Sequence, residues 1–145
     1  MPVVNLSNGV LITKIKDTTS AAGSTVLESS ILDMAGYDGV LLFTSYGTAA
    51  ADNLLKAKMS SANDSATMGD IEGSAIAPGA SDEDQWIDIY RPRKRYIQLS
   101  AARATSTKLG DMWAIQYGGR KLPEDNNTAG TIAGEALVSP STGTA

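Results

Sequence analysis

The sequence predicts an all-β protein, an antiparallel β-sandwich that is jelly-roll-like and carries extended terminal arms. Short apolar runs alternate with polar residues at a period of two, and clusters of Gly, Ser, Asn and Asp separate these runs. No stretch shows the 3.6-residue period of a long helix. The 145 residues favour a single domain, and an apolar fraction of 42% with one Phe predicts a thin core.

The chain divides into a folded part and a tail. We expect residues 1–122 to form the β-sandwich, including an N-terminal strand or arm. From Lys121 onward the sequence has no aromatic residue and little periodicity. We therefore expect residues 123–145 to form an extended C-terminal arm.

The first half of the chain predicts three strands. Residues 10–16, 40–46 and 54–64 are apolar or alternating runs, and Gly39 and Gly47 bracket the second of them. The Ser/Thr/Gly/Ala stretch over 17–24 indicates a loop, and residues 26–34 fit either a short helix or a strand.

The second half contains a pair of alternating runs around a basic connector. We expect strands over 86–90 and 96–101, joined by residues 91–95. Pro92 lacks a backbone donor and therefore interrupts any ladder at the connector. The remaining expectations are a surface excursion over 60–85, a turn over 105–111 and a final strand over 112–119.

Composition excludes several function classes. The chain has no Cys and no His, so it lacks disulfides, zinc–thiolate sites and the commonest general base. The glycines form no nucleotide-binding motif. We therefore assign no catalytic, cofactor-binding or metal-ligating residue and expect no enzyme and no cofactor. An enzyme acting through Asp82, Glu83 and Asp84 is the weakest hypothesis.

Charge and hydropathy bear on partners and location. The formal net charge of −4 disfavours non-specific binding to nucleic acid or to an anionic membrane. The N-terminus lacks the pattern of a signal peptide, and no run is long enough for a transmembrane helix. These features predict a soluble protein made in the cytoplasm, with no nucleic-acid or membrane partner.

The basic connector is the candidate partner-binding site. The arginines and the lysine could contact phosphate while the flanking tyrosines stack on bases. Alternatively, the cations could pair with the protein's own acids or bind an acidic surface on a partner protein. The adjacent acids favour pairing within the protein over nucleic acid. The residues concerned are Tyr90, Arg91, Arg93, Lys94, Arg95 and Tyr96.

Two further groups have both a functional and a structural interpretation. The acids at 82–84, and more weakly Asp64, Asp70 and Glu72, could bind Ca²⁺, but their spacing does not match an EF-hand and a solvated loop fits better. The tryptophans and tyrosines could line a sugar site. In a protein with one Phe they are better explained as the bulk of the core or of an interface.

A family resemblance covers most of residues 36–123 and the last few residues. The segments MAGYDGVLLF, DIYRPRKRYIQLSAARAT and MWAIQYGGRKLP, with the ending VSPSTGTA, resemble the capsid decoration or cement proteins of tailed bacteriophages. The resemblance implies a β-sandwich on the outer surface of the virion head. It implies the major capsid protein as partner, a homodimer or homotrimer, and no cofactor or catalytic residue.

The resulting hypothesis is a structural virion protein that binds the major-capsid shell and stabilises it. Charge and flexibility, rather than the resemblance, place the capsid contact at residues 91–95 and at the arm from Pro123. Another virion protein, such as a head–tail or tail accessory component, is an alternative. A carbohydrate-binding β-sandwich with Trp86 and Trp113 in its site is another.

Overall fold

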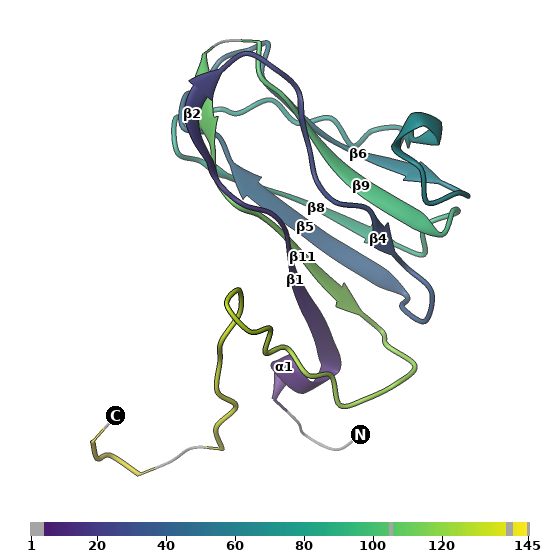
Figure 1. Cartoon of the computed structure of the whole chain (residues 1–145), viewed down its shortest axis with the longest axis vertical. Coiled ribbons are helices and arrows are strands. Elements are labelled where there is room, and N and C mark those ends of the chain that lie inside the picture. Colours follow the sequence, from purple (N-terminus) through teal and green to yellow (C-terminus); the bar gives the residue numbers. More distant parts are fainter. Residues whose placement is uncertain (1–4, 105, 139–140, 145) are drawn as a thin grey trace.

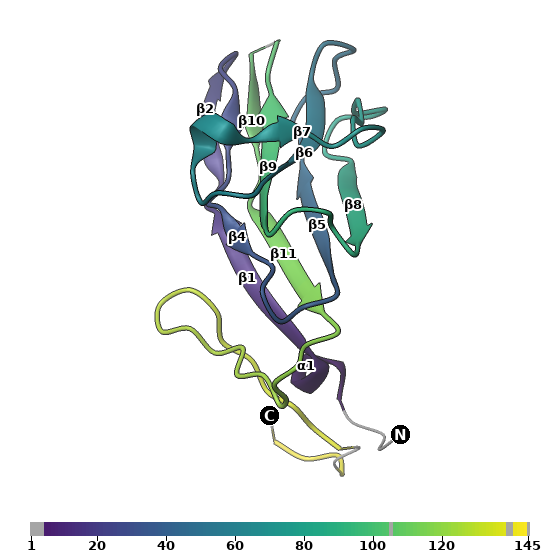
Figure 2. The ribbon, with the colours of Figure 1, turned by 90° about the vertical axis from the view of Figure 1, so that its right-hand side faces the viewer.

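The chain folds into two antiparallel β-sheets that face each other (Figures 1 and 2). A computed structural model describes residues 5–104, 106–138 and 141–144. The first sheet has the order β1 (Val10–Lys16), β11 (Met112–Tyr117), β5 (Gly39–Ser45) and β8 (Asp84–Tyr90). The second contains β3 (Leu27–Glu28), β4 (Leu32–Asp33), β9 (Tyr96–Ala102), β6 (Leu54–Ser60) and β7 (Gly69–Asp70), with β3 and β4 both paired to β9.

Successive strands alternate between the two sheets. The chain passes from β1 to β3 and β4, back to β5, across to β6 and β7, and then through β8 and β9 to β11. The order β1-β11-β5-β8 facing β3/β4-β9-β6-β7 is the winding of a jelly roll. The prediction of an all-β antiparallel sandwich is confirmed.

The core lies between the two sheets and is built from alternate residues of each strand. Its fully buried members come from β5 and the residue after it, β6, β9 and β11, and three of them are alanines, which keep the layers close. Tyr46 is the one aromatic side chain buried in this core among the described residues, and its hydroxyl donates to the carbonyl of Ala102 at 3.0 Å. The core residues with no exposed surface are Val40, Leu42, Tyr46, Leu55, Ala57, Ile97, Leu99, Ala101, Met112 and Ala114.

A β-bulge explains why alternation fails in the first strand. Lys14 pairs with Trp113 and Lys16 pairs with Met112, so Ile15 is an extra residue in β1. The bulge turns Ile15 into the core, where it is 4% exposed.

A two-stranded ribbon forms where the sequence indicated a loop and a turn. β2 (Thr19–Gly23) pairs with β10 (Thr107–Leu109), so the loop prediction over 17–24 and the turn prediction within 105–111 were wrong for these residues. The ribbon lies at one end of the molecule, and the N- and C-terminal segments lie at the other (Figure 1). Residues 26–34, for which the sequence fits either a short helix or a strand, contain the short strands β3 and β4.

The ribbon depends on one buried side chain rather than on strand-forming residues. Arg103 is 5% exposed, and its guanidinium donates to the carbonyls of Ala21 at 3.3 Å, Thr25 at 3.0 Å and Thr107 at 2.9 Å. These bonds join both strands of the ribbon to the end of β9. Because these contacts are long-range, the Ser, Ala and Gly residues of β2 give no local sequence signal for a strand.

The excursion between β6 and β8 stays on the surface but is fixed to β6. It contains a 3-10 turn, η1 (Ser65–Thr67), and the short β7. Ser74 is buried, and its hydroxyl accepts from the Ala57 amide at 3.1 Å. Ile76 and Leu55 exchange two backbone hydrogen bonds of 2.8 and 2.7 Å.

The segment after β11 returns to the start of the chain. Asn126 accepts from the Ile12 amide at 2.7 Å and donates to the carbonyl of Val10 at 2.9 Å. It therefore covers the outer edge of β1, next to the helical turn α1 (Leu6–Gly9). Within the described ranges, no helix has the length and apolar character needed to cross a membrane.

Candidate partner-binding surfaces

The basic connector joins the two sheets. β8 belongs to the first sheet and β9 to the second, so residues 91–95 cross from one layer to the other and do not form a hairpin. Arg91 has a φ of 51°, in the left-handed region, and its amide donates to the Asp38 carbonyl at 2.7 Å. The connector is therefore held in a defined conformation at the end of the sandwich opposite the ribbon.

One arginine of the connector is satisfied within the protein. The Arg95 guanidinium donates to both carboxylate oxygens of Asp33, at 2.8 and 2.7 Å. These hydrogen bonds, together with one from the Ala35 amide, lower the pKa of Asp33 to about 2. The prediction of pairing with the protein's own acids therefore holds for Arg95. Its partner comes from β4, not from the acids immediately upstream in the sequence.

The other cations of the connector are exposed. Arg91, Arg93 and Lys94 make no ion pair within 4 Å among the described residues, whereas Arg120 pairs with Asp38 at 3.0 Å. All five cationic side chains line one open cleft of about 470 Å³, which we call the basic cleft. Two carboxylates against five cations leave an excess of three positive charges in a protein whose net charge is −4.

The tyrosines that flank the connector do not form a stacking pair. Tyr90 ends β8 in the first sheet, and Tyr96 begins β9 in the second. Each lies under an arginine, with Arg91 at 5.1 Å from the Tyr90 ring centre and Arg95 at 5.3 Å from that of Tyr96. Tyr90 is 62% exposed and faces away from the core.

A row of aromatic side chains crosses the outer face of the first sheet. Trp113, Phe43 and Trp86 are directly paired on β11, β5 and β8, so they point to the same side. Trp113 and Phe43 stack with ring centres 6.5 Å apart, and Lys14 lies 5.3 Å from the centre of Trp113. Trp86 is 65% exposed.

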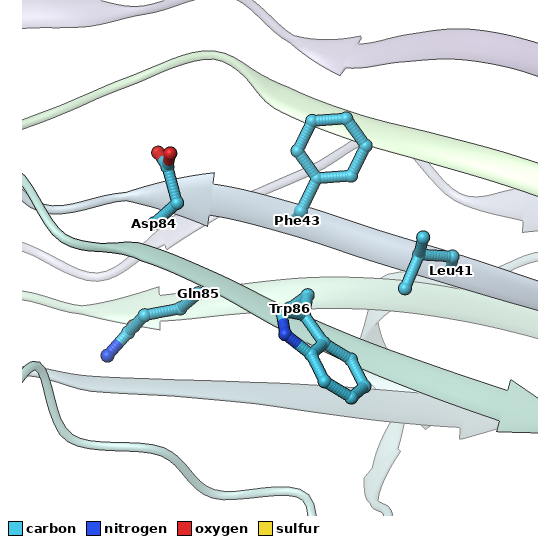
Figure 3. Close-up of a pocket in the computed structure, with 5 residues that line it drawn as sticks. All are labelled: Leu41, Phe43, Asp84, Gln85 and Trp86. Carbon is cyan, nitrogen blue, oxygen red and sulfur yellow. The ribbon is translucent and has the colours of Figure 1, made fainter.

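This surface, here called the aromatic face, continues along the strands. Figure 3 shows Leu41 and Phe43 on β5 beside Trp86 on β8, around a shallow hollow of about 480 Å³. Ile12, Ile115, Leu41 and Asp88 form the next row. Of the two structural explanations for the tryptophans, the core is wrong, because both project outward from the first sheet, and the interface stays a prediction.

A tyrosine fixes one end of the aromatic face. The Tyr117 ring lies over Gly39, where an added Cβ would come within 2.3 Å of the ring, so only glycine fits beneath it. The Tyr117 hydroxyl donates to Asp88 at 2.7 Å. Burial, and then this carboxylate, raise the pKa of Tyr117 to about 12.

In the acidic loop that contains residues 82–84, backbone amides of the same loop donate to a carboxylate. Glu83 accepts from the amides of Gly79 at 2.6 Å and Ala80 at 3.2 Å. In the part of the chain that the structure describes, no group of three or more potential ligands could hold a metal ion. The loop is a turn closed by Glu83.

Sequence reasoning missed Arg120 and the outward apolar residues. Arg120 reaches the basic cleft only because β11 ends beside Asp38, whose amide donates to the Tyr117 carbonyl at 2.9 Å. The aromatic face did leave a signal. In the run Val40–Phe43 both faces of the strand are apolar, which is typical of a sheet covered on both sides.

The fold and these surfaces define a small jelly-roll protein with two outward surfaces suited to binding, one cationic and one apolar. No protein-family model and no curated protein matches the sequence. Among solved structures the fold is similar to that of the PBSX exported protein XepA. The TM-score is 0.56 and the sequence identity 15%, over 93% of this chain and 46% of XepA. This chain thus spans about half the length of XepA, and the likeness is one of fold.

Proposed function

We propose that this protein is a structural, non-enzymatic component of a phage virion that binds the outside of the major-capsid shell and stabilises it. The observation that carries the proposal is the basic cleft, in which Arg91, Arg93 and Lys94 have no carboxylate partner among the residues that the structure describes. The sequence resemblance to decoration proteins supports the capsid as target. The fold shared with XepA, a protein of the phage PBSX, supports a phage origin.

The cleft suits an acidic protein surface. Arginine presents a planar fork that binds carboxylates in pairs, as Arg95 does with Asp33. Exposed ion pairs contribute about 0–1 kcal/mol each, so a single contact is weak. Several copies acting together on a repeating lattice gain affinity through effective concentration, which is why a homo-oligomer belongs to the proposal.

Co-sedimentation with undecorated, expanded shells tests the proposal. Wild-type protein should pellet with the shells at micromolar concentration. The double variant Arg93→Ser/Lys94→Ser should bind more weakly, because both side chains are exposed and line the cleft. Arg91 is left unchanged in this test because its backbone conformation is unusual.

A matched control separates the cleft from overall charge. The double variant Lys16→Ser/Lys108→Ser changes the net charge by the same amount at positions outside the cleft. It should bind shells as the wild type does. Wild-type protein that stays in the supernatant, or equal loss in both double variants, would contradict the proposal.

A carbohydrate-binding role is the second candidate function. It is favoured by the 65% exposure of Trp86 beside the hollow in the aromatic face. Aromatic rings on a flat β-surface can stack on sugar rings. A glycan array probed with wild type and with Trp86→Ala tests this role. The wild type should bind at least one glycan on the array, and the variant should not bind it.

A further inference from the structure

We infer that the aromatic face is the contact surface between two copies of this chain, related by a two-fold axis that runs parallel to the strands, between β11 and β5. The inference deepens the oligomer that forms part of the proposed function. It concerns the protein free in solution and uses none of the residues of the basic cleft.

The outer side of this sheet is apolar where water should favour polar residues. Antiparallel sheets that face solvent on one side alternate apolar and polar residues. Here Leu41 and Phe43 of β5 and Trp113 and Ile115 of β11 all project outward, beside the exposed Trp86. A continuous apolar face of this kind marks an interaction site.

The two margins of the same face carry charges of opposite sign. Lys14 lies on β1 at one margin, and Asp84 and Asp88 lie on β8 at the other. Lys14 shares a row with Trp86 through the pairs Lys14–Trp113, Trp113–Phe43 and Phe43–Trp86. The row of Asp84 lies on one side of Trp86 and that of Asp88 on the other.

A two-fold axis parallel to the strands exchanges the two margins. It places Lys14 of each copy over Trp86 of the other, between the two aspartates, where a cation–π contact and ion pairs form in addition to the pairs of Lys14 with Asp17 at 3.5 Å and Asp111 at 3.4 Å in its own chain. Trp113 of each copy then faces Phe43 of the other. An axis perpendicular to the strands, along the row of Lys14, would instead place Lys14 on Lys14 and Asp84 on Asp88, and like charges repel.

The aromatic face is also close to the size of a small specific interface. Four strands about 4.8 Å apart, each about 23 Å long, give a face of roughly 450 Å² in plan. Side-chain relief raises the accessible area above the plan area, toward the ~600 Å² per partner of a small specific interface. Two such sheets pack face to face with strands aligned to within about 30°. The expected product is a dimer that forms with increasing concentration.

Sedimentation equilibrium of the full chain tests the inference. Wild type should shift from monomer to dimer as concentration rises. Trp86→Ala should raise the dimer Kd about tenfold or more, because it removes the exposed ring that receives Lys14 of the other copy, and buried aromatic residues dominate interfaces. Val26→Ala is the matched control, since Val26 is also an exposed large apolar residue, 57% exposed, but lies outside this face. It should leave the Kd unchanged.

A charge exchange tests the direction of the axis. Lys14→Asp and Asp84→Lys should each weaken the dimer, and the combined variant should restore it to within a few-fold of wild type. Thermal unfolding of each variant checks that the fold is intact. A combined variant no tighter than the single ones would overturn the proposed axis.

Other outcomes overturn the interface itself. These are a wild type that stays monomeric at every concentration, or a dimer that Trp86→Ala does not weaken. Glycan binding by the monomer that Trp86→Ala abolishes would assign the face to a sugar instead. Shell co-sedimentation, read with Arg93→Ser/Lys94→Ser, is independent of these results, so either proposal can fail alone.

Discussion

At the scale of single residues, two arginines show how position decides the role of the same side chain. Arg103 is buried, and carbonyl groups surround its charge. Arg95 is exposed and binds one carboxylate. The sequence marked Arg95 as part of a basic run and left Arg103 unremarked, because nothing near Arg103 in the chain reveals that strands from three places converge on it.

Removing the Arg103 guanidinium should destabilise the fold. Arg103→Met removes the donor of one buried and two partly buried hydrogen bonds to carbonyls, and we expect a loss of about 2–4 kcal/mol in the free energy of unfolding. Urea denaturation measures this loss, and hydrogen exchange should locate it in β2 and β10. Arg120→Met, at an exposed site, is the control and should change stability little. A stability within about 0.5 kcal/mol of wild type would show that Arg103 is dispensable.

The carboxyl group of Asp33 should titrate at about pH 2, below its ordinary value of 3.8. The folded state favours the ionised form, so the contribution of the pair is complete above about pH 4. It is lost as the pH falls toward 2. An NMR titration of the side-chain carboxyl carbon measures the pKa. Arg95→Gln should return it toward the ordinary value, and an unchanged pKa in this variant would contradict the assigned cause.

At the scale of elements, the two edges of the first sheet are protected from further strand pairing in different ways. β8 carries Asp84 and Asp88, whose charges discourage further strand pairing. β1 is covered by the segment that follows β11, in which Asn126 takes the place of a neighbouring strand. The sequence predicted an extended arm from residue 123 but gave no reason to expect its first part to lie on β1.

Removing the Asn126 side chain should open the outer edge of β1. In Asn126→Ala the Ile12 amide loses its acceptor, and the Val10 carbonyl loses a donor. We expect faster exchange of the Ile12 amide hydrogen and a loss of about 1 kcal/mol in global stability. Asn127→Ala is the matched control, because the Asn127 side chain accepts from the Gly134 amide at 2.9 Å and, among the described residues, makes no hydrogen bond to β1. Equal exchange rates in the two variants would argue against this role.

At the scale of the whole molecule, function depends on separated surfaces over one shared core. The basic cleft lies at the end where β8 crosses to β9, and the aromatic face covers one side of the first sheet. The class of fold followed from alternating runs such as 40–46 and 96–101. The assignment of surfaces did not, since whether Trp86 points inward or outward depends on register, which pairing partners far along the chain decide.

Binding to shells should weaken with salt. Contacts between exposed charges are screened over about 8 Å at physiological ionic strength, so raising the salt should reduce co-sedimentation of the wild type. Arg93→Ser/Lys94→Ser should show a shallower dependence because two contributing charges are gone. Dimerisation through the aromatic face should change less. If co-sedimentation of the wild type with shells did not change with salt concentration, the basic cleft would be excluded as the main contact.

The pairing of β1 with β11 joins residues near opposite ends of the chain, Val10 with Tyr117. During translation, the first sheet cannot close until residue 117 has left the ribosome. Trp113 and Phe43 come together only then. A nascent polypeptide therefore lacks the complete aromatic face until β11 has emerged, which delays self-association through that face.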